Sequence, residues 1–531
     1  MPKLFIFAIG GTGERVLRST AMLLASGAPA FDNYEVFPII IDYDKKNADK
    51  ERTVKLLQTY NKINTAAYGR HTAQGDAVKL ENEFFAARLR NIDVLEDYVY
   101  PFHPASENEK FKDYIGLETL SGVNLATGAF LESLFDKSSR PDTELNLDMT
   151  VGFKGNPNIG SVVFHTIAGT TEFNRIMTYF QPGNGDKAVV IGSLFGGTGA
   201  SGIPEIVKAI NSAKGNKAQI ATILVLPYFH PEASDGAAIK AERFNSKTKA
   251  ALDFYEKSGI YEYIKNVYYV GDPCCTVIPY CDGGDKQENK ANFVELISAM
   301  MIEHFVAQRG DGNKFFKFAI DAQLIPVPGQ KAGERLFIAD FDKVSIKGSL
   351  NHLVTLGIAL KFFHEEIFEK DKKLGGKDFF EILKAACEKD SEAAKRLKAL
   401  YEGLDKFYNL YQGWLKELDF EGNDIQAPNS HRVALTDMTR NYSDMIIAEA
   451  KTENDDAGLI DKAKRFISSR INSLDADNLF AFMNTAAGTH LQDKIKILKV
   501  NHEAEWVFAD ILRNAATNGF DKINPQTPNK K

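Results

Sequence analysis

The chain has 531 residues, which is too long for one hydrophobic core and predicts two or three domains. Its hydrophobic content of 44% and aromatic content of 11% suffice for globular packing. Lys and Arg total 64 against 71 Asp and Glu, a formal charge of −7, which argues against a general nucleic-acid or membrane-surface binder because neither finds a positive field here.

No apolar run is long enough to cross a bilayer, and the first three residues lead into a strand rather than a signal peptide. We therefore expect a cytoplasmic protein without a membrane span. Four cysteines are too few for a disulfide framework at this length. Cys274, Cys275 and Cys281 cluster, but their spacing fits no common pair of zinc ligands.

Strand and helix patterns alternate through the first 310 residues. Continuous apolar strands separated by helices predict a Rossmann-like parallel sheet with helices on both faces, an α/β fold. The expected strands are residues 4–9, 36–41, 145–151, 188–192, 220–226 and 267–270, and the expected helices include residues 205–213, 237–258 and 287–308. The last helix is apolar nearly all round, which predicts a buried helix.

The remaining segments divide the chain further. Within the α/β domain expected at 1–310, residues 50–142 are polar and mainly helical, and we interpret them as an insertion. Residues 311–349 connect to a mainly α-helical C-terminal domain at 350–515, where apolar residues recur at helical spacing. The polar tail at 516–531 predicts disorder.

Glycine-rich turns carry the strongest functional signal. An apolar strand runs into Gly196, Gly197, Thr198 and Gly199, and a helix opens there. Glycines let the backbone approach a phosphate, and the helix N-terminus adds partial positive charge. The hydroxyls of Thr198 and Ser201 add possible donors. No lysine follows until Lys208, so this is not a Walker A loop.

Two further turns have the same character. The first strand ends in Gly10, Gly11, Thr12 and Gly13, and a later turn contains Gly155, Asn156 and Pro157 between apolar runs. Each turn alone is also compatible with an ordinary connection between a strand and a helix that binds no ligand. Because ligands bind parallel sheets at the carboxyl ends of the strands, three such turns predict one phosphate-bearing ligand held from several sides.

The order of these motifs resembles the tubulin/FtsZ superfamily, as in a divergent prokaryotic tubulin-like protein. The motifs are Gly-Gly-Thr-Gly, then Gly-Asn-Pro-x-x-Gly, then Gly-Gly-Thr-Gly-x-x-x-x-Pro, and the resemblance covers roughly residues 3–344. It implies a GTPase-type domain that binds GTP or GDP with Mg²⁺ and assembles head to tail into a cytoskeletal filament. It also implies that the phosphates hold the magnesium, without direct protein ligands.

The resemblance assigns further residues to the nucleotide site. Arg15 follows the first loop, and Asp42 and Asp44 follow the second strand, where the family places a loop near the magnesium. Glu232 loosely matches an acidic ribose contact, and Asn292 lies where the family reads guanine. Solvated loop acids and a polar residue at the start of a helix remain alternatives, and a phosphatase nucleophile at Asp42 lacks the expected threonine.

Hydrolysis depends on a loop that departs from the family pattern. Asp340 is the best match to the family's catalytic segment, but Ile338 replaces its asparagine and Lys343 occupies the position of its last acid. This exchange resembles β-tubulin, whose lysine leaves the neighbouring nucleotide unhydrolysed. Asp342 lies one residue earlier and is the candidate substitute, because phosphoryl transfer depends on placement and electrostatics.

Three functions remain open at this point. The first is a self-assembling GTP-binding protein with slow or conditional hydrolysis. The second is a non-hydrolysing nucleotide-binding scaffold whose C-terminal helices bind a protein partner. The third is a Rossmann-type NAD(P) oxidoreductase, which lacks the third glycine of Gly-x-Gly-x-x-Gly and leaves the loops at Gly155 and Gly196 unexplained.

Overall fold

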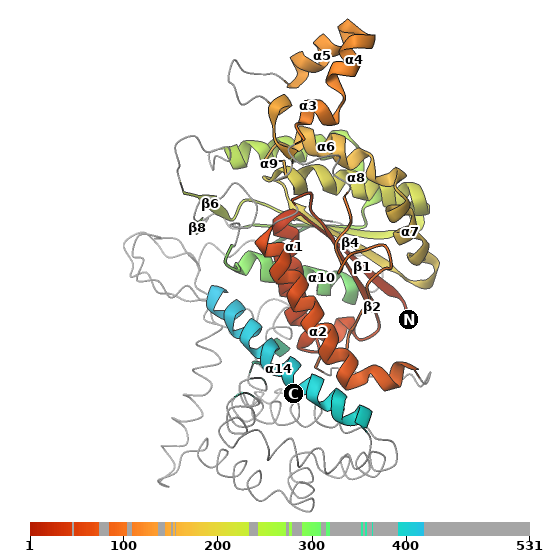
Figure 1. The fold of residues 1–531 in the computed structure, drawn as a ribbon, viewed down its shortest axis with the longest axis vertical. Coiled ribbons are helices and arrows are strands. Elements are labelled where there is room, and N and C mark those ends of the chain that lie inside the picture. Colours follow the sequence, from red (N-terminus) through yellow and green to blue (C-terminus); the bar gives the residue numbers. More distant parts are fainter. Residues whose placement is uncertain are drawn as a thin grey trace, which may run out of the picture.

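A parallel sheet organises the part of the chain that the computed structural model describes (Figure 1). That part comprises residues 1–44, 47–73, 84–102, 109–135, 144–149, 152–153, 155–232, 243–271, 276–278, 289–308, 315–318 and 391–418, with a few positions between 352 and 364. The sheet has seven strands in the order β3-β2-β1-β4-β5-β7-β9, and all neighbours are parallel. The prediction of an α/β fold is confirmed.

The central strands form where the sequence has uninterrupted apolar runs. Every residue of β4 is buried, as a strand covered by helices on both faces requires. Two short strands, β6 (Phe229–Pro231) and β8 (Thr276–Ile278), pair separately. The strands of the main sheet are β1 (Lys3–Ile9), β2 (Glu35–Ile41), β3 (Arg88–Leu89), β4 (Lys187–Ser193), β5 (Gln219–Val225), β7 (Asn266–Val270) and β9 (Phe315–Phe318).

Helices cover both faces of this sheet, and successive residues of β1 divide between them. Leu4, Ile6 and Ala8 belong to one apolar core, which includes residues of α1 (Gly10–Ala25), α2 (Ala48–Ala73) and α10 (Phe293–Ala307). The alternate residues of β1 belong to the other core, beneath α6 (Pro157–His165), α7 (Thr171–Tyr179), α8 (Gly197–Lys214) and α9 (Phe244–Lys257). Figure 1 shows these two layers on opposite sides of the strands.

The segment expected as an insertion is only partly separate from the domain. Its first helix, α2, packs against α1, and its strand β3 extends the main sheet. The short helices α3 (Phe111–Tyr114), α4 (Leu117–Val123) and α5 (Leu125–Phe135) project from the α6 side of the molecule (Figure 1). This projection exposes the apolar side chains of Leu120, Val123, Leu125, Phe130 and Leu134.

The C-terminal half contributes one long helix to the described structure, α14 (Ser391–Leu418). Its apolar stripe lies in the same core as α1 and α2, with Phe407 edge-on to Phe85 at a centroid distance of 4.7 Å. Thus α14 shares a core with helices that cover one face of the sheet. Apart from a few positions between 352 and 364, the rest of the helical domain expected at 350–515 lies outside the described residues, as do the tail at 516–531 and all of 311–349 except β9.

Two expectations about individual elements were wrong. Residues 144–149 form no strand but a single turn of 3₁₀ helix followed by one isolated bridge between Lys110 and Asp148. β1 already pairs with β2 on one edge and with β4 on the other, and the start of the outer edge of β2 pairs with β3. Residues 144–149 therefore form hydrogen bonds with the chain beside α3 instead. The buried helix α10 begins at Phe293, not near residue 287, because Asn292 caps it in a capping box with Glu295.

Within the described residues, no helix combines the length and the apolar character that crossing a bilayer requires.

We expect Phe407→Ala to lower the free energy of unfolding by about 3 to 5 kcal/mol, because the ring is fully buried between α14 and the N-terminal core. Urea denaturation followed by circular dichroism measures the change. The control is Lys406→Ala at the neighbouring exposed position, which should stay within about 0.5 kcal/mol of the wild type. Equal stability of both variants would mean that α14 does not dock as described.

Candidate functional site

The three glycine-rich turns meet at the carboxyl ends of β1 and β4. A Cβ atom built on Gly10 would lie 3.1 Å from the Cβ of Thr198, so the first turn touches the central one. A Cβ built on Gly197 would lie 3.0 Å from the amide nitrogen of Asn156 and 3.2 Å from the Cα of Gly155. The central turn therefore contacts both of the others, although the three are far apart in sequence.

At two positions of these turns, the conformation or the close packing of the backbone favours glycine over any residue with a side chain. Gly10 has a φ of +67°, the left-handed region that residues with a side chain rarely adopt. A Cβ on Gly199 would lie 2.6 Å from both the amide nitrogen and the carbonyl oxygen of Ser193. Helix α8 therefore begins in direct backbone contact with the end of its own strand, and no larger residue fits there.

Three helices begin at this meeting point. α1, α6 and α8 start after Ile9, Asn156 and Gly196, and at these three described starts no capping side chain accepts a hydrogen bond from the first turn. By contrast, Thr170 caps α7 and Asn292 caps α10. The first N–H groups of an α-helix have no partner within the helix, and with the helix dipole they favour a bound anion.

The polar side chains beside the turns differ in their exposure and in the hydrogen bonds that they already form. Thr198 is partly exposed at the start of α8. Ser201 is buried, and its hydroxyl donates within its own helix to the carbonyl of Gly197 at 2.7 Å. Lys247 of α9 donates to the carbonyl of Gly155 at 2.6 Å, and burial lowers its pKa. Sequence reasoning missed Lys247 because it lies 92 residues from its partner.

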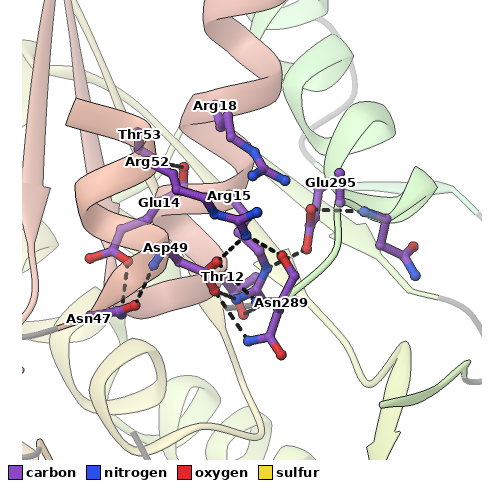
Figure 2. A network of polar contacts seen from close by, with 12 residues as sticks. Thr12, Glu14, Arg15, Arg18, Asn47, Asp49, Arg52, Thr53, Asn289 and Glu295 are labelled. Carbon is purple, nitrogen blue, oxygen red and sulfur yellow. Dashed lines mark hydrogen bonds and ion pairs between the residues drawn. The ribbon is translucent and has the colours of Figure 1, made fainter. Parts of the chain in front are cut away.

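Arg15 lies in a network of buried charges beside the first glycine turn (Figure 2). Its guanidinium donates to Glu295 at 2.6 Å, to Asp49 at 2.9 Å and to the hydroxyl of Tyr228 at 2.8 Å. Its contact with the loop is a 3.4 Å approach to the hydroxyl oxygen of Thr12. Arg15 was expected at the nucleotide, and in this structure it joins α1 to α2 and α10.

The acids that follow β2 are also buried. Asp42 accepts hydrogen bonds from the amide of Asp44 at 3.2 Å and from the side chain of Asn47 at 3.0 Å, and burial raises the pKa of its carboxyl. The carbonyl of Asp44 accepts from Lys50. The structure thus uses the side chain of Asp42 to shape the turn rather than presenting it to solvent.

Glu14 is a buried acid that sequence reasoning did not single out. Its side chain accepts from Asn47 at 3.0 Å, and its other oxygen, Oε1, has no hydrogen-bond partner among the described residues (Figure 2). Burial, followed by the charge of Asp42, raises the pKa of Glu14 well above its ordinary value. The available signal was the run of charged residues within the otherwise apolar pattern of α1.

The other residues that the sequence predicted for the site have different positions: one caps a helix, one is exposed, and the hydrolysis candidates are not among the described residues. The side-chain oxygen of Asn292 accepts from the amide of Val294 at 2.9 Å, so it serves as a helix cap. Glu232 is exposed after β6. The hydrolysis candidates Asp340 and Asp342, with Ile338 and Lys343, lie outside the described residues, as do the three clustered cysteines. Among described residues, no group of three or more His, Cys, Asp or Glu is arranged to hold a metal ion.

We expect Gly199→Ala to destabilise the protein by about 3 kcal/mol, because its methyl group would meet backbone atoms that cannot rotate away. The matched control is Gly183→Ala, where a Cβ meets nothing within 4 Å, and its stability should change by less than about 0.5 kcal/mol. Thermal and urea unfolding measure both. If Gly199→Ala is as stable as the control, α8 does not contact β4 as described.

The raised pKa of Glu14 makes stability dependent on pH. In the unfolded chain Glu14 loses its proton above its ordinary pKa of 4.5, whereas in the folded state it keeps the proton up to its raised pKa. The free energy of unfolding therefore falls as pH rises from 4.5 to the raised pKa of the folded state. Glu14→Gln should flatten this decline, by up to about 1.4 kcal/mol per pH unit, and should stabilise the protein at neutral pH. Urea midpoints from pH 5 to 8 test this, with exposed Glu118→Gln as the control. An unchanged slope would contradict the assignment.

Comparison of this chain with protein-family models, with curated proteins and with solved structures finds no significant match in any of the three. A function for this protein can therefore be argued only from its own sequence motifs and from the geometry of the site.

Proposed function

We propose that this protein binds a guanine nucleotide in the manner of the tubulin/FtsZ superfamily, with the phosphates at the meeting point of the three glycine turns. One observation carries the proposal. β2 lies on one side of β1 and β4 on the other, so the order of the sheet reverses between β1 and β4. Ligands of open α/β sheets bind at such a reversal, outside the carboxyl ends of the strands. The turns that contain Gly10 and Gly196 follow these two strands.

The residues present fit a polyphosphate. The amides at the starts of α1 and α8, around Gly11 and Gly197, have no capping side chain and supply donors, and Thr198 is partly exposed beside them. Lys247 places a positive charge beside Gly155. A magnesium ion would arrive with the phosphates, because the carboxylate of Asp42 is already engaged within its own turn.

Guanine specificity, head-to-tail assembly and hydrolysis rest on the resemblance in sequence. In this proposal the nucleotide lies between subunits of a filament, and hydrolysis is slow or conditional because Lys343 stands where the family has an acid. The same exchange favours the second candidate, a scaffold that binds nucleotide without hydrolysing it. A dinucleotide oxidoreductase is less favoured, because the acid after β2, Asp42, is buried and bonded to Asn47 instead of open to a ribose.

Thr198→Val should weaken binding of GTP about tenfold, because it removes one hydroxyl donor to a charged phosphate while keeping the shape of the side chain. Titration of fluorescent GTP in the presence of Mg²⁺ measures the affinity, with ATP and NAD as competitors. Thr178→Val, at an exposed position of α7, is the control and should bind as the wild type does. Tighter binding of NAD than of GTP, or no effect of Thr198→Val, would contradict the proposal.

Assembly and turnover separate the two nucleotide-binding candidates. Light scattering with GTP and with GDP reports assembly, and phosphate release reports hydrolysis. Turnover that Asp342→Ala abolishes favours the GTPase over the scaffold. Unchanged particle size with either nucleotide would remove the filament from the proposal while leaving nucleotide binding intact.

A further inference from the structure

A continuous set of polar contacts links the first glycine turn to helix α14, which lies about 400 residues further along the chain. It begins at Thr12, whose hydroxyl faces Arg15 at 3.4 Å, and passes from Arg15 to Asp49 at 2.9 Å. The side chains of Arg15 and Asp49 are 3% and 0% exposed, so water does not compensate either charge. Figure 2 shows Arg15 between Thr12, Asp49 and Glu295.

Asp49 is the junction of this network. It accepts from Arg15, from Arg52 at 2.6 Å, and from both the backbone and the side chain of Asn289 at 3.2 Å. Arg52 in turn donates to Asp49, to the backbone carbonyl of Asn289 and, at 2.8 Å, to Glu417 of α14, so the two acids share one guanidinium. Any movement of Arg52 toward one acid therefore weakens its hold on the other.

Glu417 attaches α14 to three elements at once. Its carboxylate accepts from Arg18 of α1 at 2.5 Å, from Arg52 of α2 at 2.8 Å, and from the backbone amide of Ala291 at 2.7 Å. Ala291 directly precedes Asn292, the cap of α10. One carboxylate thus joins the C-terminal helix to the helix that opens at the first glycine turn and to the start of α10.

We propose that α14 is a latch, fastened by Glu417, whose docking weakens when a nucleotide occupies the glycine turns. The inference rests on the proposed function. Phosphate charge beside Thr12 attracts Arg15 away from Asp49, and the buried carboxylate of Asp49 then keeps Arg52 as its one cationic partner among the described residues. Asp49 then draws Arg52 fully to itself, and Glu417 loses one of its two cationic partners. Because linkage is reciprocal, docked α14 lowers the affinity for nucleotide by the same factor.

Glu417→Gln tests the latch, because it keeps the shape of the side chain and removes its charge. Fluorescent GTP with Mg²⁺ should bind this variant three- to tenfold more tightly than the wild type. In the wild type, amide hydrogen exchange of α14 should be faster with GTP than without it, and in Glu417→Gln it should be fast in both conditions. Exposed Glu402→Gln on the same helix is the control and should behave as the wild type in both measurements.

Arg52→Lys is the second variant, because lysine cannot bridge Asp49 and Glu417 with a planar fork. It should also raise GTP affinity, and the double variant should gain less than the product of the two single effects. If the wild type binds no GTP, both the proposed function and the latch are wrong. If all variants bind GTP equally, or if GTP leaves exchange in α14 unchanged, the latch alone is wrong. Circular dichroism confirms that each variant is folded.

Discussion

The structure depends on the close approach of backbone to backbone where β1 and β4 lie side by side. Gly199 fits against Ser193 with no space for a Cβ atom, and Gly10 turns directly into α1. Two helices consequently begin next to each other, and their first amides face the same edge of the sheet. This arrangement supplies partial positive charge without a lysine of the Walker A type, and so the phosphate site that we propose rests on the main chain.

A second constraint is the burial of charge within α1. Arg15 and Arg18 are both at most 5% exposed, and each guanidinium ion must be compensated because its desolvation is costly. The compensating groups come from α2, α10 and α14. Charge pairing therefore fixes the relative positions of four helices, and α14 cannot belong to a domain that is independent of the sheet.

The sequence predicted what local pattern determines. Continuous apolar runs located β1, β2, β4, β5 and β7, and the turns of Gly10 and Gly196 lie at the strand ends where they were expected, whereas no strand precedes the turn of Gly155 among the described residues. The partners of individual side chains were not predictable. Asp49 bonds to Asn289, 240 residues away, and nothing near either residue indicates the pairing. The supposed strand at residues 145–151 had the correct apolar alternation, but the neighbouring edges of the sheet were already occupied.

The rigidity of the turns bears on how the protein can respond to a ligand. Main-chain contacts such as that between Gly199 and Ser193 leave no room for the turns to shift against the strands. Side chains that share hydrogen-bond donors are different, because Arg52 can favour either Asp49 or Glu417 without any movement of the backbone. A signal from the glycine turns is therefore carried more readily by the exchange of ion pairs than by loop movement. In the latch that we propose, this exchange of ion pairs reaches Glu417 and displaces α14.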